Sequence, residues 1–151
     1  MRATVVSRQW ATDILSTSML ARVDPTLALH MPRNISHQDA SLIHRMRLNV
    51  AFTAQWRYCL RQVDSPRCCH CGDIENLEHI LLHCPYYEPF RTALAVSLNQ
   101  LDSRHITMTK LLGPWSNSAH QCSALKAPHY EAYHYFHQIT TSNGVEYRLW
   151  Q

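Results

Sequence analysis

Residues 68–84 read CCHCGDIENLEHILLHC, and this stretch carries the strongest chemical signal in the chain. Its ligand-type residues form the pattern C-x2-C-x7-H-x4-C and are Cys68, Cys71, His79 and Cys84. A tetrahedral Zn2+ ion takes four thiolate or imidazole ligands, and two cysteines separated by two residues can both point at one ion from a tight turn. The spacing therefore predicts a structural zinc site with these four ligands and Zn2+ as the cofactor.

The second half of the motif fits a short helix. Asp73 is suited to cap its N-terminus, and Pro85 follows the last ligand, where a helix should stop. Apolar residues recur at helical spacing along it: Ile74, Leu77, Ile80 and Leu81. We expect His79 to lie on this helix and Cys84 at its end, where both can reach one ion.

Other uses of the ligand-type residues stay open. Cys69 and His83 are neighbours of Cys68 and Cys84, although adjacent residues point in different directions and one ion should use one of each pair. Ordinary buried cysteines would show the same residue types without a metal. A third use is a disulfide framework.

A disulfide framework needs an oxidising compartment. The N-terminal sequence has no continuous apolar stretch of signal-peptide length, because Arg8 and Asp13 interrupt it. We therefore expect the chain inside the cell, in the cytoplasm or nucleus. No segment is apolar over the length needed to span a bilayer, so no membrane partner is expected.

Composition predicts a mainly α fold: one small helical domain organised around a structural zinc knuckle. Hydrophobic residues make up 46% of the 151 residues, and three glycines with little strict alternation argue against a sheet. We expect an N-terminal helix and connector over 1–34, a basic helix with the zinc module and a following helix over 35–101, and short helices with a partly disordered tail over 102–151.

Sequence signals for helix starts and helix ends set the boundaries of the expected elements. A first helix is expected near 7–20, ending before Asp24 and Pro25. Ser36 followed by Asp39 resembles a capping box and opens the long segment SLIHRMRLNVAFTAQWRYCL. Apolar residues of this segment fall on one side of a helical wheel and are expected in the core: Leu42, Met46, Phe52, Trp56 and Leu60.

Charge is distributed unevenly along the chain. The segment from 33 to 67 contains six arginines and two aspartates, whereas the segment from 68 to 88 contains four acidic residues and neither lysine nor arginine. Arginine pairs bidentately with phosphate and stacks on bases, and Trp56 and Tyr58 lie among these arginines. The candidate contacts to single-stranded RNA or DNA are Arg45, Arg47, Arg57 and Arg61. The alternative is a solvated helix face that forms salt bridges with the acidic zinc module.

Two runs of sequence resemble a known family. IHRMRLNVAFT (43–53) and SPRCCHCGDIENLEHILLHCPYYEPFRTAL (65–94), with LLGPW (111–115), are similar to the zinc-binding region that closes the polyprotein of many non-LTR (LINE-like) retrotransposons, among them tick transposon proteins. In that family the region follows the reverse transcriptase. The resemblance covers roughly residues 20 to 126.

The resemblance implies specific roles for residues of this chain. It implies that Cys68, Cys71, His79 and Cys84 are the zinc ligands and that Arg45 and Arg47 are basic positions before the knuckle. It also implies that the region grips template RNA or target DNA beside the catalytic domains of the parent element.

The sequence does not predict an enzyme or a small-molecule substrate. It contains no adjacent pair of aspartates for the metal ions of a polymerase, and its acidic residues are dispersed. A zinc ion with four protein ligands has no open position for water. A catalytic cysteine among Cys59, Cys69 and Cys122 remains an alternative, although no spacing identifies its base.

Two further alternatives concern function as a whole. The zinc could hold helices in place for a protein-interaction module, with Trp56 and Phe52 exposed for a partner. The chain could also be a retrotransposon fragment without a function of its own. In the tail, Glu131 and His134 lie three residues apart and could bind a second metal, but no other ligand pair supports them.

Overall fold

The computed structural model of the protein describes residues 18–31, 33, 35–117 and 119–124. The elements in chain order are α2 (Met19–Val23), α3 (His37–Arg47), α4 (Ala54–Cys59), the π-helical turn η1 (His79–His83), the 3-10 turn η2 (Pro85–Tyr87), α5 (Glu88–Asn99) and α6 (Met108–Leu112). Residues 119–124 are also helical. The described ranges contain no β-strand, only an isolated antiparallel bridge between Arg67 and Ile74. The prediction of a mainly α fold is confirmed.

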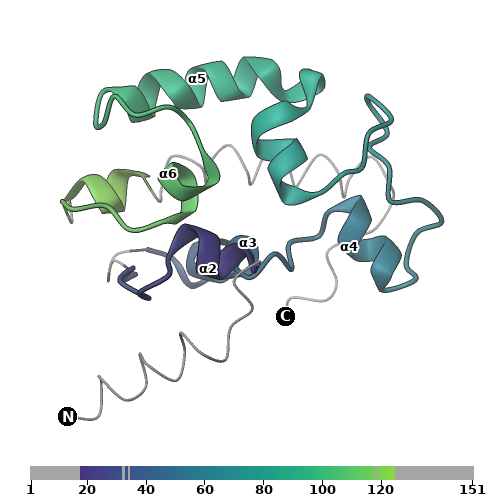
Figure 1. Ribbon diagram of the computed structural model, residues 1–151, viewed down its shortest axis with the longest axis horizontal. Helices are drawn as coiled ribbons and strands as arrows, with labels where there is room; N and C mark the ends of the chain where they lie inside the picture. The colour runs from purple at the N-terminus through teal and green to yellow at the C-terminus, as the bar shows by residue number, and fades with distance from the viewer. Residues whose placement is uncertain (1–17, 32, 34, 118, 125–151) are drawn as a thin grey trace, which may run out of the picture.

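Four helices enclose the main hydrophobic core. In Figure 1, α5 runs along the top, α2 and α3 lie along the bottom, and α6 lies between these two levels. Their buried side chains in this core are Met19, Val23, Ile43, Met46, Leu94, Leu98, Met108, Leu111 and Leu112. Full burial of an aliphatic side chain of this kind contributes about 1.5–3 kcal/mol, so this core is the main source of stability.

A second, smaller cluster surrounds two of the predicted ligands. It contains Cys68, Ile80, Cys84 and Tyr87, with Phe90 packed against it. The short helix at 77–83 contributes side chains to both clusters. Ile80 belongs to the small cluster, whereas Leu77 and Leu81 are buried in the main core. The segment with the predicted ligands is therefore attached to the main core through one turn of helix.

Hydroxyl side chains begin four of the helices. Each accepts a hydrogen bond from a backbone N–H in the first turn, at 3.1–3.2 Å, and the four caps are Ser18, Ser36, Thr53 and Thr107. Such a bond satisfies one of the backbone donors that a helix leaves unpaired at its start. The helix start predicted at Ser36 is confirmed.

The segment 41–60 is not one helix, as its pattern suggested, but parts of α3 and α4. Asn49 has a left-handed backbone, with φ of 58°. Its N–H donates to the carbonyl of Met46 at 3.1 Å, and the Val50 N–H donates to the carbonyl of Arg45 at 2.9 Å. These two bonds form a Schellman motif, which needs one residue with a left-handed backbone. Asparagine is second only to glycine in how readily it adopts that conformation.

The break separates the side chains expected on one helical face. Met46 is fully buried, Trp56 is half-buried, and Leu60 is 46% exposed. The helical-wheel prediction placed these side chains on one core face because it assumed that 41–60 is a continuous helix. α4 therefore lies beside the main core with its own orientation, at the right of Figure 1.

A buried ion pair joins α2 to α3. Asp24 is completely buried and accepts a hydrogen bond from the Arg47 guanidinium, which is 5% exposed. The same carboxylate accepts from the N–H groups of Ala28 and Leu29 at 2.8 and 3.1 Å. Asp24 is also the C-cap of α2, so the predicted helix end before Pro25 is confirmed. Most of the helix predicted near 7–20 lies outside the described residues.

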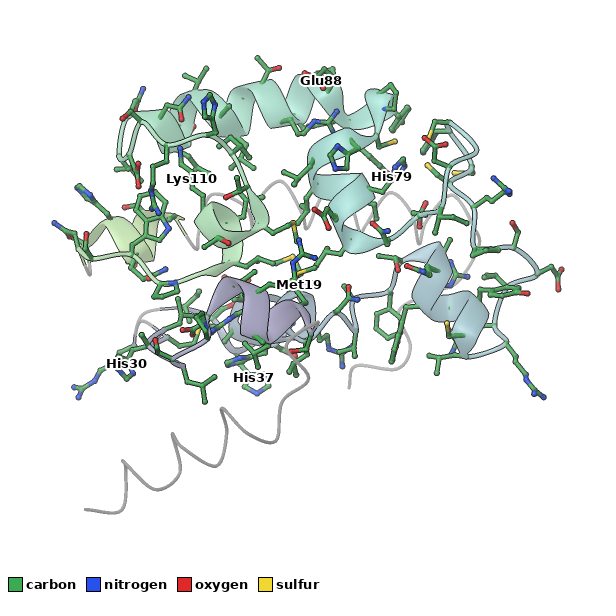
Figure 2. All side chains as sticks on the ribbon, in the orientation of Figure 1. Met19, His30, His37, His79, Glu88 and Lys110 are labelled. Carbon is green, nitrogen blue, oxygen red and sulfur yellow. The ribbon has the colours of Figure 1, made fainter. Side chains whose placement is uncertain are left out.

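A buried lysine joins α6 to the end of α5. Lys110 is 1% exposed, and its Nζ donates to Asn99 Oδ1 at 2.8 Å, to the Asp102 carbonyl at 2.7 Å and to the Arg104 carbonyl. All three ammonium protons thus have acceptors. Figure 2 shows this side chain reaching from α6 toward α5. α6 ends at Gly113, which is its C-cap.

Some predictions cannot be placed on the described residues. The tail from 125 to 151, including Glu131 and His134, lies outside them. Among the helices that are described, none is long and apolar enough to cross a membrane.

Candidate metal centre

The first half of the centre is a tight turn. The Gly72 N–H donates to the Cys68 carbonyl at 2.9 Å, and the Cys68 N–H donates to the Asp73 carbonyl at 2.7 Å. Gly72 has φ of 84°, a backbone conformation that glycine adopts without steric cost. The reversal places Cys68 and Cys71 on the same side of the loop, as the C-x2-C spacing predicted.

The second half begins with a different cap from the predicted one. Asn76, not Asp73, caps the helix, because its Oδ1 accepts from the His79 N–H at 2.7 Å. The helix starts at 77, so Ile74 lies outside it and is 39% exposed instead of packing on its apolar face. The chain from 72 to 76 is thus a non-helical connector, which pairs with Arg67 through Ile74. Figure 2 shows His79 on this short helix, below the start of α5 at Glu88.

The π-helical geometry of η1 explains how His79 and Cys84 meet. In a regular α-helix, residues five apart lie about 140° apart around the axis. Here the Cys84 N–H donates to the His79 carbonyl at 2.7 Å, an i→i+5 bond that winds an extra residue into the turn. The wider turn brings Cys84 back toward the side that carries the His79 ring.

The four predicted ligands converge on one point. Their ligand atoms all lie within 4.8 Å of one another. Cys68 Sγ and Cys84 Sγ are 3.8 Å apart, and Cys71 Sγ and His79 Nε2 are 3.3 Å apart. In a tetrahedron around Zn2+, with bonds of about 2.3 Å to sulfur and about 2.0 Å to nitrogen, the corresponding edges are about 3.8 and 3.5 Å. The cluster is close enough to hold a metal ion, and it is the one such group among the described residues.

Burial distinguishes the ligands from their neighbours. Cys68, His79 and Cys84 are buried and Cys71 is exposed, whereas the alternative ligands Cys69 and His83 are both exposed and outside the cluster. The predicted residue of each adjacent pair thus lies in the cluster, and its neighbour lies outside it.

Burial favours the neutral forms of the clustered side chains. Burial raises the pKa of the Cys68 thiol to about 12, although the backbone N–H groups of His70 and Cys71 oppose the shift. Burial also raises the pKa of the Cys84 thiol and lowers the pKa of the His79 imidazole. The imidazole is thus neutral at pH 7, the form that binds metals, and the two buried sulfurs need a nearby cation to become thiolates.

Arg91 of α5 holds the end of η1. Its guanidinium donates to the Cys84 carbonyl at 2.6 Å and to the Ile80 carbonyl at 3.4 Å. It also pairs with Glu88. The last carbonyls of a helix lack partners within it, so this arginine both satisfies them and fixes the backbone of a ligand.

Glu75 joins the metal centre to α4, a contact that the sequence did not reveal. The side chain is 3% exposed, and its Oε1 accepts from the Ala54 N–H at 2.7 Å. The Glu75 carbonyl accepts from the Gln55 N–H at 3.1 Å. A carboxylate at a helix start is favourable, because the first N–H groups there are unpaired. No local pattern in the sequence could show this contact, because Glu75 and Ala54 lie 21 residues apart.

Three aromatic rings cover one side of the centre. His70 and Tyr86 are stacked, with ring centroids 3.6 Å apart and an interplanar angle of 2°. Tyr87 is nearly perpendicular to both rings, at 5.7 Å from His70 and 5.0 Å from Tyr86. No periodic pattern of residues predicted this cluster, although each ring lies within three residues of a predicted ligand.

The structure separates the four arginines predicted to contact nucleic acid. Arg45 is half-buried over the Phe52 ring, 5.2 Å from its centroid. Arg57 is half-buried on α4, and Arg61 is exposed just after it. Arg47 does not fit the prediction, because its buried guanidinium is paired with Asp24 and a phosphate cannot reach it.

No protein-family model matches the chain, and no curated protein or solved structure matches it at a significant level.

Proposed function

We propose that the chain is a non-catalytic zinc-binding module, of the kind found at the end of LINE-like retrotransposon polyproteins, that contacts single-stranded RNA or DNA. The observation that carries the proposal is the convergence of three cysteines and one histidine, whose ligand atoms all lie within 4.8 Å of one another and include two separations, 3.8 and 3.3 Å, close to the edges of a zinc tetrahedron. The similarity of residues 43–53 and 65–94 to that family supports the retrotransposon origin.

Zinc is the metal that this donor set favours. Three thiolates and one imidazole are soft to borderline ligands, and their tetrahedral arrangement is typical of zinc. With all four positions taken by protein, the ion has no open position for a substrate or water. Its role is therefore structural, as in other zinc modules whose metal supplies folding energy.

The nucleic-acid part of the proposal rests on the chain between α4 and the knuckle. Arg57, Arg61 and Arg67 lie within eleven consecutive residues, and none of the three is fully buried. Arginine binds phosphate through several donors in a fixed plane. The hydrogen bonds from Ala54 and Gln55 to Glu75 hold α4, and with it this basic segment, beside the metal centre.

The metal is tested by measuring zinc and structure together. We expect one zinc per purified chain by elemental analysis, and loss of that zinc in Cys71→Ser and Cys84→Ser. Cys59→Ser and Cys69→Ser are matched controls, because both cysteines are exposed and outside the cluster. Full zinc content in Cys84→Ser would overturn the assignment.

The nucleic-acid contact is tested by the salt dependence of binding. Each phosphate contact contributes about 0.7 to the slope of log K against log salt for a single strand. The double variant Arg57→Ala, Arg61→Ala should therefore bind a fluorescent oligonucleotide more weakly and with a slope reduced by about 1.4. The control Arg33→Ala, Arg104→Ala removes the same charge from exposed positions elsewhere. Equal losses in both variants would mean that net charge, not this segment, drives binding.

A protein-interaction module is the second candidate, and one observation favours it. Tyr58, Leu60 and Ile74, on or near α4, are 47%, 46% and 39% exposed. Phe52 and Trp56, the residues first expected to face a partner, are half-buried. This candidate predicts no measurable affinity for single strands at physiological salt, so the binding experiment separates the two.

A further inference from the structure

Among the described residues, the rings that contact the stacked pair of His70 and Tyr86 leave the outer face of Tyr86 uncovered. Three centroid distances locate the third ring: 3.6 Å between His70 and Tyr86, 5.0 Å between Tyr86 and Tyr87, and 5.7 Å between His70 and Tyr87. If Tyr87 lay beyond Tyr86, its separation from His70 would approach the sum of the other two distances. The observed value is far smaller, so Tyr87 lies beside the stack and does not cover the outer face of Tyr86.

Exposure agrees with this geometry. Tyr87 is 1% exposed and fills the small core, whereas Tyr86 remains 48% exposed although His70 covers one face of its ring. Aromatic side chains of this size usually bury most of their surface. The exposed half of Tyr86 is therefore a flat ring surface at the edge of the metal centre.

The backbone holds both rings close to ligands. His70 lies in the turn between Cys68 and Cys71, and Tyr86 lies in η2, two residues after Cys84. The Tyr87 N–H donates to the Cys84 carbonyl at 3.2 Å, and Pro85 restricts the start of η2. A ring held in place before binding loses little conformational entropy when a ligand stacks on it.

A cationic group lies on the same turn. Arg67 is exposed, and its Nη1 donates to the Gly72 carbonyl at 2.8 Å. That bond uses one of the five N–H donors of the guanidinium. A flat aromatic face with an arginine on the adjoining loop is the combination with which proteins bind single strands: the ring stacks on a base and the cation meets the backbone.

We propose that the outer face of Tyr86, supported by His70, is a stacking site for one unpaired nucleobase. The proposal rests on the proposed function and assigns the base contact within it. An unpaired base is required, because bases inside a duplex do not present their faces to a side chain. Since every base has such a face, the site is expected to tolerate all four bases.

The test compares a strand with bases and a strand without them. The zinc-loaded protein is titrated with a thymidine oligonucleotide of about 12 nucleotides and with an abasic strand of the same length and charge. The wild-type chain should bind the thymidine strand about 10-fold more tightly, the contribution of one stacked base. Tyr86→Ala should lose this preference and leave affinity for the abasic strand unchanged, whereas Tyr86→Phe should keep it.

Zinc content is measured for each variant, so that loss of fold is not mistaken for loss of stacking. If Tyr86→Ala loses zinc, Tyr86→Leu takes its place, because leucine can cover His70 without offering an aromatic face. An unchanged preference in the zinc-loaded Tyr86→Ala or Tyr86→Leu chain would overturn the stacking site and leave the proposed function standing. Equal wild-type affinity for both strands would do the same. No binding of either strand would overturn both proposals.

Discussion

At the scale of single residues, the left-handed positions show how local chemistry sets the ends of the helices. Asn49 ends α3 and Arg61 ends α4, with φ of 58° and 57°. The Gln62 N–H donates to the Arg57 carbonyl and the Arg61 N–H to the Tyr58 carbonyl, both at 2.9 Å. The two ends are thus the same Schellman motif, but an arginine occupies the second one at a steric cost that glycine does not have.

Arg61→Gly should therefore stabilise the protein. Glycine removes the strain of the left-handed backbone, but it also has more conformational entropy to lose on folding. The first contribution to the free energy is the larger one, so we expect the free energy of unfolding to rise by about 0.5 kcal/mol. Arg57→Gly is the matched control, because it places glycine inside α4 and should cost about 1 kcal/mol. Denaturant titration of both variants measures the difference. A loss of stability in Arg61→Gly would contradict the strain argument.

Glycine has two different roles in this chain. At Gly113 an added Cβ would lie 2.5 Å from the carbonyl oxygens of both Thr109 and Val23. At Gly72 an added Cβ would meet nothing within 4 Å, but φ is 84°. The first glycine allows α2 to approach the end of α6, and the second allows the knuckle to turn.

The two glycines should respond differently to asparagine. Gly113→Ala and Gly113→Asn should each lower the free energy of unfolding by about 1–3 kcal/mol, because the backbones of α2 and α6 must move apart. Gly72→Ala should cost about 1 kcal/mol, and Gly72→Asn less, because asparagine tolerates the left-handed region. Thermal unfolding of the four zinc-loaded variants checks this. A Gly113→Asn variant that is clearly more stable than Gly113→Ala would contradict the close approach of the two backbones at Gly113.

At the scale of elements, Glu75 determines where α4 lies. α4 has six residues and contributes no buried side chain, so an isolated helix of this length would not persist. Its position depends on the Thr53 cap and on the two hydrogen bonds to Glu75. The basic segment of the proposed function is consequently held by an acidic residue of the metal module.

Glu75→Ala should destabilise the zinc-loaded protein by about 1–3 kcal/mol, because it leaves the Ala54 N–H without its acceptor near the core. Glu78→Ala is the control. Glu78 forms an exposed pair with Arg22 at 3.4 Å, and removal of such a pair costs about 0–1 kcal/mol. Denaturant midpoints, together with helicity, measure both. Equal effects would mean that Glu75 acts only as a surface charge.

The helix signals that the sequence carries are local ones, and those predictions are confirmed. The helix start at Ser36 and the helix end at Asp24 depend on neighbours within a few residues, and so does the close approach of the four predicted ligands. The break between α3 and α4 was missed because Asn49 is a weak stop signal inside a continuous apolar pattern. Arg47 was misassigned for a related reason: its partner Asp24 is 23 residues away, and no local pattern shows which arginine will be buried.

At the scale of the whole molecule, the two hydrophobic clusters differ in what they can support alone. The main core takes side chains from α2, α3, α5 and α6 and from the helical segments 77–83 and 119–124, whereas the small cluster has four buried members, two of which are predicted ligands. A cluster of this size buries too little surface to stay ordered without the metal.

Removal of zinc should therefore unfold one part of the protein and spare the other. After chelation, we expect backbone amides of 67–76 and α4 to lose protection from hydrogen exchange, while amides of α3 and α6 keep theirs. Exchange followed by mass spectrometry resolves these segments. Protection that persists around the knuckle, or is lost equally everywhere, would contradict the division into two clusters. Restoring zinc should reverse the change.

The unequal burial of the ligands also has a consequence for the lifetime of the bound metal. Three ligands are enclosed, and Cys71 alone faces solvent. A chelator, an exchanging ion or an oxidant therefore meets the sulfur of Cys71 first, since attack on a thiolate follows its exposure. In the proposed zinc-loaded protein, the bond to Cys71 would therefore be the first to open, and exchange of the metal would begin at the surface of the molecule.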